Sequence, residues 1–183
     1  AVTTLATSLA RDLPGARART RGKHTLVLKR LGTGDRSQFQ RVAARVRDAL
    51  IGTPTFRACI PGIEFFQTAT DGTSPVVYLA VESPELRRLH DRLCGTVDPV
   101  AGMEGEAYVP HVTVARGGSV EAAGRLAARD IDPGTGTVTE LQFWDAERSL
   151  AARTVSPAPR PAPGETRLLG CPPFPTRLGF PAG

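Results

Sequence analysis

Long apolar runs and paired cysteines are both missing from this sequence. No stretch approaches the roughly 20 apolar residues that a membrane-spanning helix needs, so we expect no membrane association. Residues 1–12 also lack the basic start and apolar middle of a secretory signal. Cys59, Cys94 and Cys171 stand at unrelated spacings without a CxxC motif, which gives no support to a thiolate metal site. We therefore expect free thiols in a reducing cytoplasm.

What is present suits one domain of ordinary size followed by a tail. The chain has 183 residues and is 40% hydrophobic, which is enough apolar material for a core. We expect a folded domain over residues 1–156. Eight of the 16 prolines fall in residues 157–183. Because proline removes a backbone donor and fixes φ, we expect this segment to be a mostly disordered tail.

The positive charge lies mainly near one end of the chain. The net charge is +5, and residues 1–36 hold eight basic residues against two acidic ones. Basic residues gathered in this way favour a local anionic partner such as a phosphodiester. A solvated basic surface is the alternative that the charge alone leaves open.

Hydrophobic periodicity predicts a mixed α and β domain. The fold class we expect is α+β with antiparallel strands, and the order strand, helix, strand, strand recurs from Tyr108, which suggests two similar lobes. Ser83 and Ser119 each stand where a helix N-cap is expected. The expected helices cover residues 5–13, 39–50, 84–93 and 120–130, and the expected strands cover residues 24–28, 56–60, 63–65, 76–81, 108–115, 138–143 and 148–155.

One of these predicted strands carries a histidine and a hydroxyl in suitable positions for phosphate chemistry. His111 and Thr113 are two residues apart, so in a strand they point to the same face. A hydroxyl can donate to a phosphoryl oxygen while an imidazole transfers a proton. A partner segment, His24-Thr25-Leu26-Val27, begins 87 residues earlier in another predicted strand.

The pair of motifs resembles the 2H phosphoesterase superfamily, in its 2′-5′ RNA ligase-like or RNA 2′,3′-cyclic phosphodiesterase branch. That superfamily carries two His-x-Thr/Ser motifs, one in each of two similar lobes. The resemblance therefore implies two pseudo-symmetric lobes of antiparallel sheet, with helices packed outside and a central cleft between the lobes. The residues that carry the resemblance are His24 to Gly32 and Val109 to Arg116. The resemblance spans about residues 2–155 and leaves the proline-rich segment outside it.

The first motif departs from the family pattern, because Thr25 follows His24 directly and Leu26 occupies the hydroxyl position. Two alternatives remain. His24 is the family histidine, with the hydroxyl supplied by Thr25 across a bulge or replaced by Arg30. Otherwise Thr25 is the family threonine and Lys23 stands in place of the histidine. We favour the first, because a lysine of ordinary pKa is a poor proton shuttle near neutrality.

The resemblance implies hydrolysis of RNA 2′,3′-cyclic phosphate ends by two-histidine acid/base catalysis, with no metal and no cofactor. His24 and His111 would then be the catalytic pair. The groups that would bind the substrate phosphate are Thr113, Thr25, Arg30 and Arg116. Run in reverse, the same geometry joins RNA ends through a 2′-5′ linkage. We expect a cytoplasmic monomer that acts on RNA ends or small cyclic nucleotides.

Other candidates have simpler structural explanations. His90 lies on the leucine face of a predicted helix, where a core-edge histidine is expected. Lys29 lies close to the first motif and could meet RNA phosphates. Tyr108 and Phe65 could stack on a base, although an aromatic residue in a strand is usually part of the core. A catalytically weak RNA- or nucleotide-binding module is the alternative function.

Overall fold

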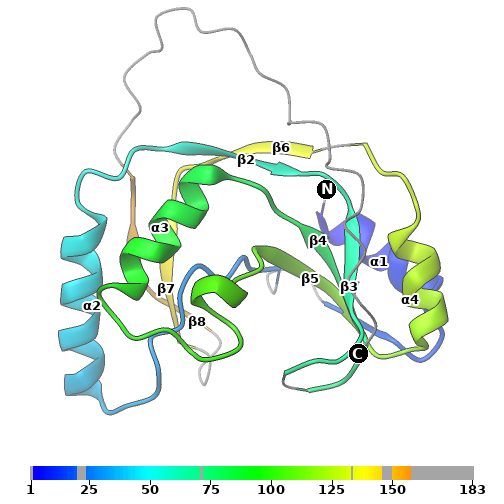
Figure 1. The fold of residues 1–183 in the computed structure, drawn as a ribbon, viewed down its shortest axis with the longest axis horizontal. Coiled ribbons are helices and arrows are strands. Elements are labelled where there is room, and N and C mark those ends of the chain that lie inside the picture. Colours follow the sequence, from blue (N-terminus) through cyan, green and yellow to red (C-terminus); the bar gives the residue numbers. More distant parts are fainter. Residues whose placement is uncertain (1, 20–23, 71, 133, 146–149, 158–183) are drawn as a thin grey trace, which may run out of the picture.

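The computed structural model describes residues 2–19, 24–70, 72–132, 134–145 and 150–157. Their order along the chain mixes helices with short strands (Figure 1). The helices are α1 (Val2–Arg11), α2 (Arg36–Leu50), α3 (Pro84–Cys94) and α4 (Val120–Ala127), with a 3₁₀ turn η1 (Gly105–Ala107). The strands are β1 (Arg17–Ala18), β2 (Phe56–Ile60), β3 (Ile63–Phe66), β4 (Val76–Ala80), β5 (His111–Arg116), β6 (Gly134–Val138), β7 (Leu141–Asp145) and β8 (Leu150–Val155).

The strands pair antiparallel in three sheets. The largest has the order β1-β5-β4-β3, and β2-β6 and β7-β8 form two-stranded sheets. The strand expected over residues 148–155 is present as β8 and pairs with β7. The single strand expected over 138–143 is divided between β6 and β7, which have different partners. Helices and antiparallel sheets together confirm the α+β class.

Serine caps begin two of the helices. Ser83 Oγ accepts from the Leu86 amide and Ser119 Oγ accepts from the Ala122 amide, so both predicted N-caps are present. None of the helices that the structure describes is long and apolar enough to cross a bilayer.

Two hydrophobic clusters divide the fold into two lobes. One cluster joins α1 and α4 to one face of the four-stranded sheet, and the other joins α2 and α3 to β2 and β7. Figure 1 shows α1 and α4 at one end of the molecule and α2 and α3 at the other. Val112 and Ile60 pack against both clusters. The face of the sheet away from α1 and α4 is therefore the face on which polar side chains can gather.

The strand expected over residues 24–28 is reduced to one antiparallel bridge, between Leu26 and Val112. Strand propensity was high here, but the hydrogen bonds of the following residues go to side chains, as described below.

The cysteines differ from one another. Cys94 is a free thiol, as expected, whereas Cys59 is disulfide-bonded, so the expectation of a free thiol is wrong for Cys59. Wide spacing along the chain does not prevent pairing in space. Cys171 and almost all of the expected tail, from residue 158 onward, lie outside the described residues.

Candidate functional site

His111 and Thr113 lie on the same face of β5, as the strand pattern predicts. In the register with β4, His111 is paired with Ala80 and Thr113 with Tyr78. Val112 and Val114 face the helices instead, where Val114 is fully buried. His111 is half-buried and Thr113 is only 8% exposed. The imidazole and the hydroxyl are thus held side by side at the centre of the sheet.

Two aromatic rings contact the ring of His111. Its ring centroid lies 5.2 Å from that of Phe66 and 5.1 Å from that of Tyr78, and Phe66 stacks on Tyr78 at 4.3 Å. The Tyr78 hydroxyl donates to Glu64 Oε2 at 2.8 Å. These contacts restrict the His111 ring to one orientation.

The aromatic residue beside His111 is Phe66 rather than the suggested Phe65, which packs against the helix-facing cluster. Alternation in β3 accounts for this, because Ile63 and Phe65 point to one face and Phe66 to the other. The alternation was visible in the sequence, but which face carried the site was not.

The His111 ring carries its proton on Nδ1. That nitrogen lies 2.7 Å from the Val109 carbonyl oxygen, which can only accept a hydrogen bond, so the lone pair of the neutral ring is on Nε2. Burial lowers the pKa of His111 below its ordinary value of 6.5 against the opposing effect of the Val109 carbonyl, and the positive charges of Arg30 and Arg116 lower it further. The ring is therefore poised to accept a proton at Nε2.

A bulge brings Arg116 to the His111 face. Regular alternation would place Arg116 on the opposite face. However, Tyr78 is paired with Thr113 and Val77 with Ala115, so Val114 is an extra residue in β5. Val114 and Ala115 are both fully buried against the helices, and Arg116 returns to the site face opposite Val76.

Arg30 reaches the same region from the segment that follows the Leu26 bridge. Its side chain is exposed, and its guanidinium is close enough to lower the pKa of His111. Lys29 does not serve as an RNA contact here. Its side chain is 2% exposed, and its ammonium forms an ion pair of 2.5 Å with Glu104, whose side chain is 1% exposed.

The Leu26 bridge also sets which first-motif side chains face His111. Directly paired residues point to the same side, and Leu26 and Val112 both pack against the cluster of α2 and α3. In an extended chain the neighbours of Leu26, Thr25 and Val27, therefore point to the side of His111, and both are exposed.

His24 shares the side of Leu26 in this alternation. Both of its ring nitrogens are buried, and neither has a hydrogen-bond partner in the part of the chain that the structure describes. Lys23, the alternative candidate, lies outside the described residues. The structure thus brings together His111, Thr113, Arg30 and Arg116 and presents Thr25 to the same side, but it does not present a His24 nitrogen there.

His90 and Tyr108 are structural. His90 is 1% exposed and stacks on Tyr108 with centroids 3.7 Å apart. Its Nδ1 lies 2.8 Å from the Leu28 carbonyl oxygen, and its Nε2 accepts from the Gly105 amide at 2.9 Å. His90 is therefore a core histidine, and Tyr108 is buried instead of offered to a base.

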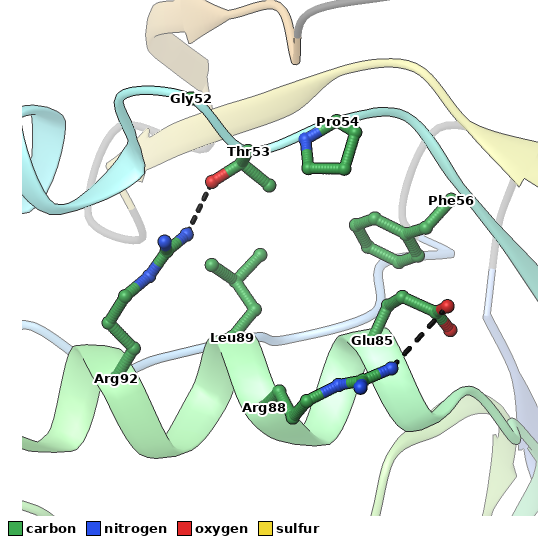
Figure 2. Close-up of a pocket in the computed structure, with 8 residues that line it drawn as sticks. All are labelled: Gly52, Thr53, Pro54, Phe56, Glu85, Arg88, Leu89 and Arg92. Carbon is green, nitrogen blue, oxygen red and sulfur yellow. Dashed lines mark hydrogen bonds and ion pairs between the residues drawn. The ribbon is translucent and has the colours of Figure 1, made fainter. Parts of the chain in front are cut away.

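A cavity of about 410 Å³ lies elsewhere, between α3 and the chain entering β2 (Figure 2). Leu89 and Phe56 form its apolar floor. Two arginines border it, but Arg92 donates to Thr53 and Arg88 forms an ion pair with Glu85. None of the predicted site residues lines this cavity, so the candidate site remains the His111 face. Among the described residues, no group of three or more His, Cys, Asp or Glu is arranged to hold a metal ion.

Comparisons with known proteins give a family match and a similar fold. The model of the 2′-5′ RNA ligase superfamily matches residues 27–150, more than half of the chain. The match includes His111 and Thr113 and begins just after His24. A crystal structure of TT0787 of Thermus thermophilus is similar, with a TM-score of 0.59 and 18% identity over 86% of this chain and 90% of that one. At this identity the likeness shows the fold alone. No curated protein matches the sequence.

Proposed function

Because the chain belongs to the 2′-5′ RNA ligase superfamily, we propose that it hydrolyses 2′,3′-cyclic phosphate ends of RNA with His111 as the general base. One observation carries the proposal, namely the state of the His111 ring. The ring holds its proton on Nδ1 and leaves Nε2 to accept another, and burial, together with the positive charges of Arg30 and Arg116, lowers its pKa. A neutral imidazole beside positive charge suits an anionic phosphodiester substrate.

In the proposed reaction, His111 Nε2 takes a proton from a water molecule as the water oxygen bonds to phosphorus. The bond between phosphorus and one ribose oxygen breaks, and that oxygen receives a proton. Thr113 donates to a phosphoryl oxygen, with Thr25 as a second hydroxyl on the same side, while Arg30 and Arg116 balance the developing charge. A 5′-hydroxyl that attacks the same cyclic phosphate in place of water, with cleavage of the bond between phosphorus and the 3′-oxygen, gives 2′-5′ ligation. No step requires a metal ion.

His24 is the proposed donor of the second proton. To act, its ring must bring a nitrogen from its buried position to the His111 face.

That placement favours a second candidate function, binding of cyclic phosphate RNA ends without turnover. The binding groups around His111 are complete in this case, whereas the second proton donor is lacking.

Hydrolysis of a 2′,3′-cyclic nucleotide by the wild type, His111→Ala and His24→Ala distinguishes the candidates. In the enzyme, either substitution lowers kcat about 10²- to 10⁴-fold while binding persists, and a chelator has no effect. Arg88→Gln, at the remote cavity, is the control and keeps full activity. Wild-type activity that survives His111→Ala would contradict the proposal. Binding without any wild-type turnover would establish the second candidate.

A further inference from the structure

Residues 27–30 run past the Leu26 bridge without forming a strand, and side chains from other parts of the chain hold them in place. The Tyr108 hydroxyl donates to the Val27 carbonyl at 2.9 Å. His90 Nδ1 lies 2.8 Å from the Leu28 carbonyl oxygen, to which it donates. Two successive carbonyls that would enter a sheet ladder are thus bound by buried side chains.

Glu104 binds the next two residues. Its Oε2 accepts from Lys29 Nζ at 2.5 Å and from the Val100 amide at 2.9 Å, and its Oε1 accepts from the Arg30 amide at 2.5 Å. Lys29 Nζ also donates to the carbonyls of Arg30 and Asp98. Burial alone would raise the pKa of Glu104, but these hydrogen bonds lower it below its ordinary value, so the carboxylate is charged.

We propose that Glu104 is a positioning residue, which fixes the backbone of Arg30 so that its guanidinium stands beside His111 and meets the substrate phosphate. The assignment rests on the proposed function for the identity of that anion. Arg30 has an exposed side chain and lies outside the strands, so two hydrogen bonds set the position of its backbone: its amide donates to Glu104, and its carbonyl accepts from Lys29, which is itself paired with Glu104.

Of glutamate, glutamine and aspartate, only glutamate can accept the hydrogen bonds at residue 104 and balance the charge of Lys29. Three donors converge on it, and one of them is a buried ammonium. A glutamine would offer a single acceptor oxygen and would leave the charge of Lys29 unbalanced. An aspartate would keep the charge, but it is one methylene shorter and could not reach both Lys29 and the Arg30 amide.

NMR titration of the His111 ring tests the proposal, because this readout needs no turnover. The chain has three histidines, so the His111 signal can be assigned with one His111→Gln spectrum. We expect the pKa of His111 to rise toward 6.5 in Arg30→Gln, Glu104→Gln and Glu104→Asp. Adding Glu104→Asp to Arg30→Gln should then cause no further change in the pKa of His111. Affinity for a 2′,3′-cyclic nucleotide should fall about tenfold in each variant.

Glu106→Gln, an exposed carboxylate in η1, is the matched control and should leave both quantities unchanged. An unchanged His111 titration in folded Glu104→Asp would overturn the proposal. If neither Glu104 variant folds, the wild type provides the test. The NMR chemical shift of the Arg30 amide proton should change as Glu104 titrates, and a chemical shift that stays constant would also overturn the proposal. A wild type that shows no turnover contradicts the proposed function alone, since the titration still tests Glu104.

Discussion

His111 combines a fixed ring with a depressed basicity. Its contacts with Phe66 and Tyr78 hold the ring plane, and the bond to the Val109 carbonyl fixes the tautomer. Burial first, and then the two arginines, disfavour the imidazolium. One residue thus carries both the geometry and the protonation state that a general base requires.

The pH profile of kcat/KM should reflect this. Because the base acts when neutral, activity should rise with pH through the pKa of His111, with a midpoint below 6.5. Arg116→Gln removes one positive neighbour and should move this midpoint to higher pH, whereas Arg88→Gln should not. A midpoint that stays constant in Arg116→Gln would show that its charge does not act on the base.

The hydroxyl of Tyr78 serves the ring arrangement instead of the reaction. Burial and the bond to Glu64 raise its pKa far above neutrality, so it remains a donor. Tyr78→Phe should cost about 1 kcal/mol in the free energy of unfolding, measured with urea, and leave kcat within about twofold. A loss of kcat comparable with that of His111→Ala would instead make the hydroxyl part of the chemistry.

At the scale of elements, the register of β5 decides which side chains share the site. The bulge at Val114 brings Arg116 to the His111 face, and the single bridge of Leu26 gives the facing positions to Thr25 and Val27. One-residue shifts exchange the two faces of a strand, so these irregularities determine the site as much as the residue types do.

Moving the first-motif histidine from position 24 to position 25 should therefore restore activity that His24→Ala removes. In the His24→Ala background, Thr25→His places an imidazole on the side of His111 and Thr113, where it can donate the second proton. We expect this double variant to hydrolyse a 2′,3′-cyclic nucleotide about tenfold or more faster than His24→Ala alone. Leu26→His in the same background is the matched control, because it inserts the same ring into the core and should only destabilise the protein. No gain in the folded double variant would contradict the inferred register.

Most elements could be predicted because their signals were local. The Ser83 and Ser119 caps, the strands β4 and β5 and the shared face of His111 and Thr113 appear as expected, and the superfamily resemblance is confirmed. The bulge at Val114 could not be predicted. Val114 and Ala115 are both apolar and small enough to be buried on the same face, so the residue types do not reveal which one is extra. The absence of a strand over residues 27–30 could not be predicted either, because their hydrogen-bond partners lie more than 60 residues away along the chain.

At the scale of the molecule, the two lobes are joined through shared core residues, and a buried ion pair joins the first-motif segment to the loop before η1. Val112 and Ile60 contact both clusters, while Lys29 and Glu104 join segments 75 residues apart in sequence. The sequence suggested two lobes from the repeated order of strands and helices. What holds the first motif against the second is a set of long-range contacts that this order does not reveal.

The ion pair should make global stability depend on acidity. The pKa of Glu104 is lowered in the folded state, so its contribution is fully present above its unfolded value of about 4.5 and is lost as pH falls through the folded pKa. Urea unfolding of the wild type between pH 7 and pH 3 should show this loss. In Lys29→Met/Glu104→Gln, which removes both buried charges together, the decline over that range should be shallower. Parallel curves for the two proteins would show that Glu104 titrates alike in the folded and unfolded chains, and that its buried contacts do not hold the carboxylate in its charged form.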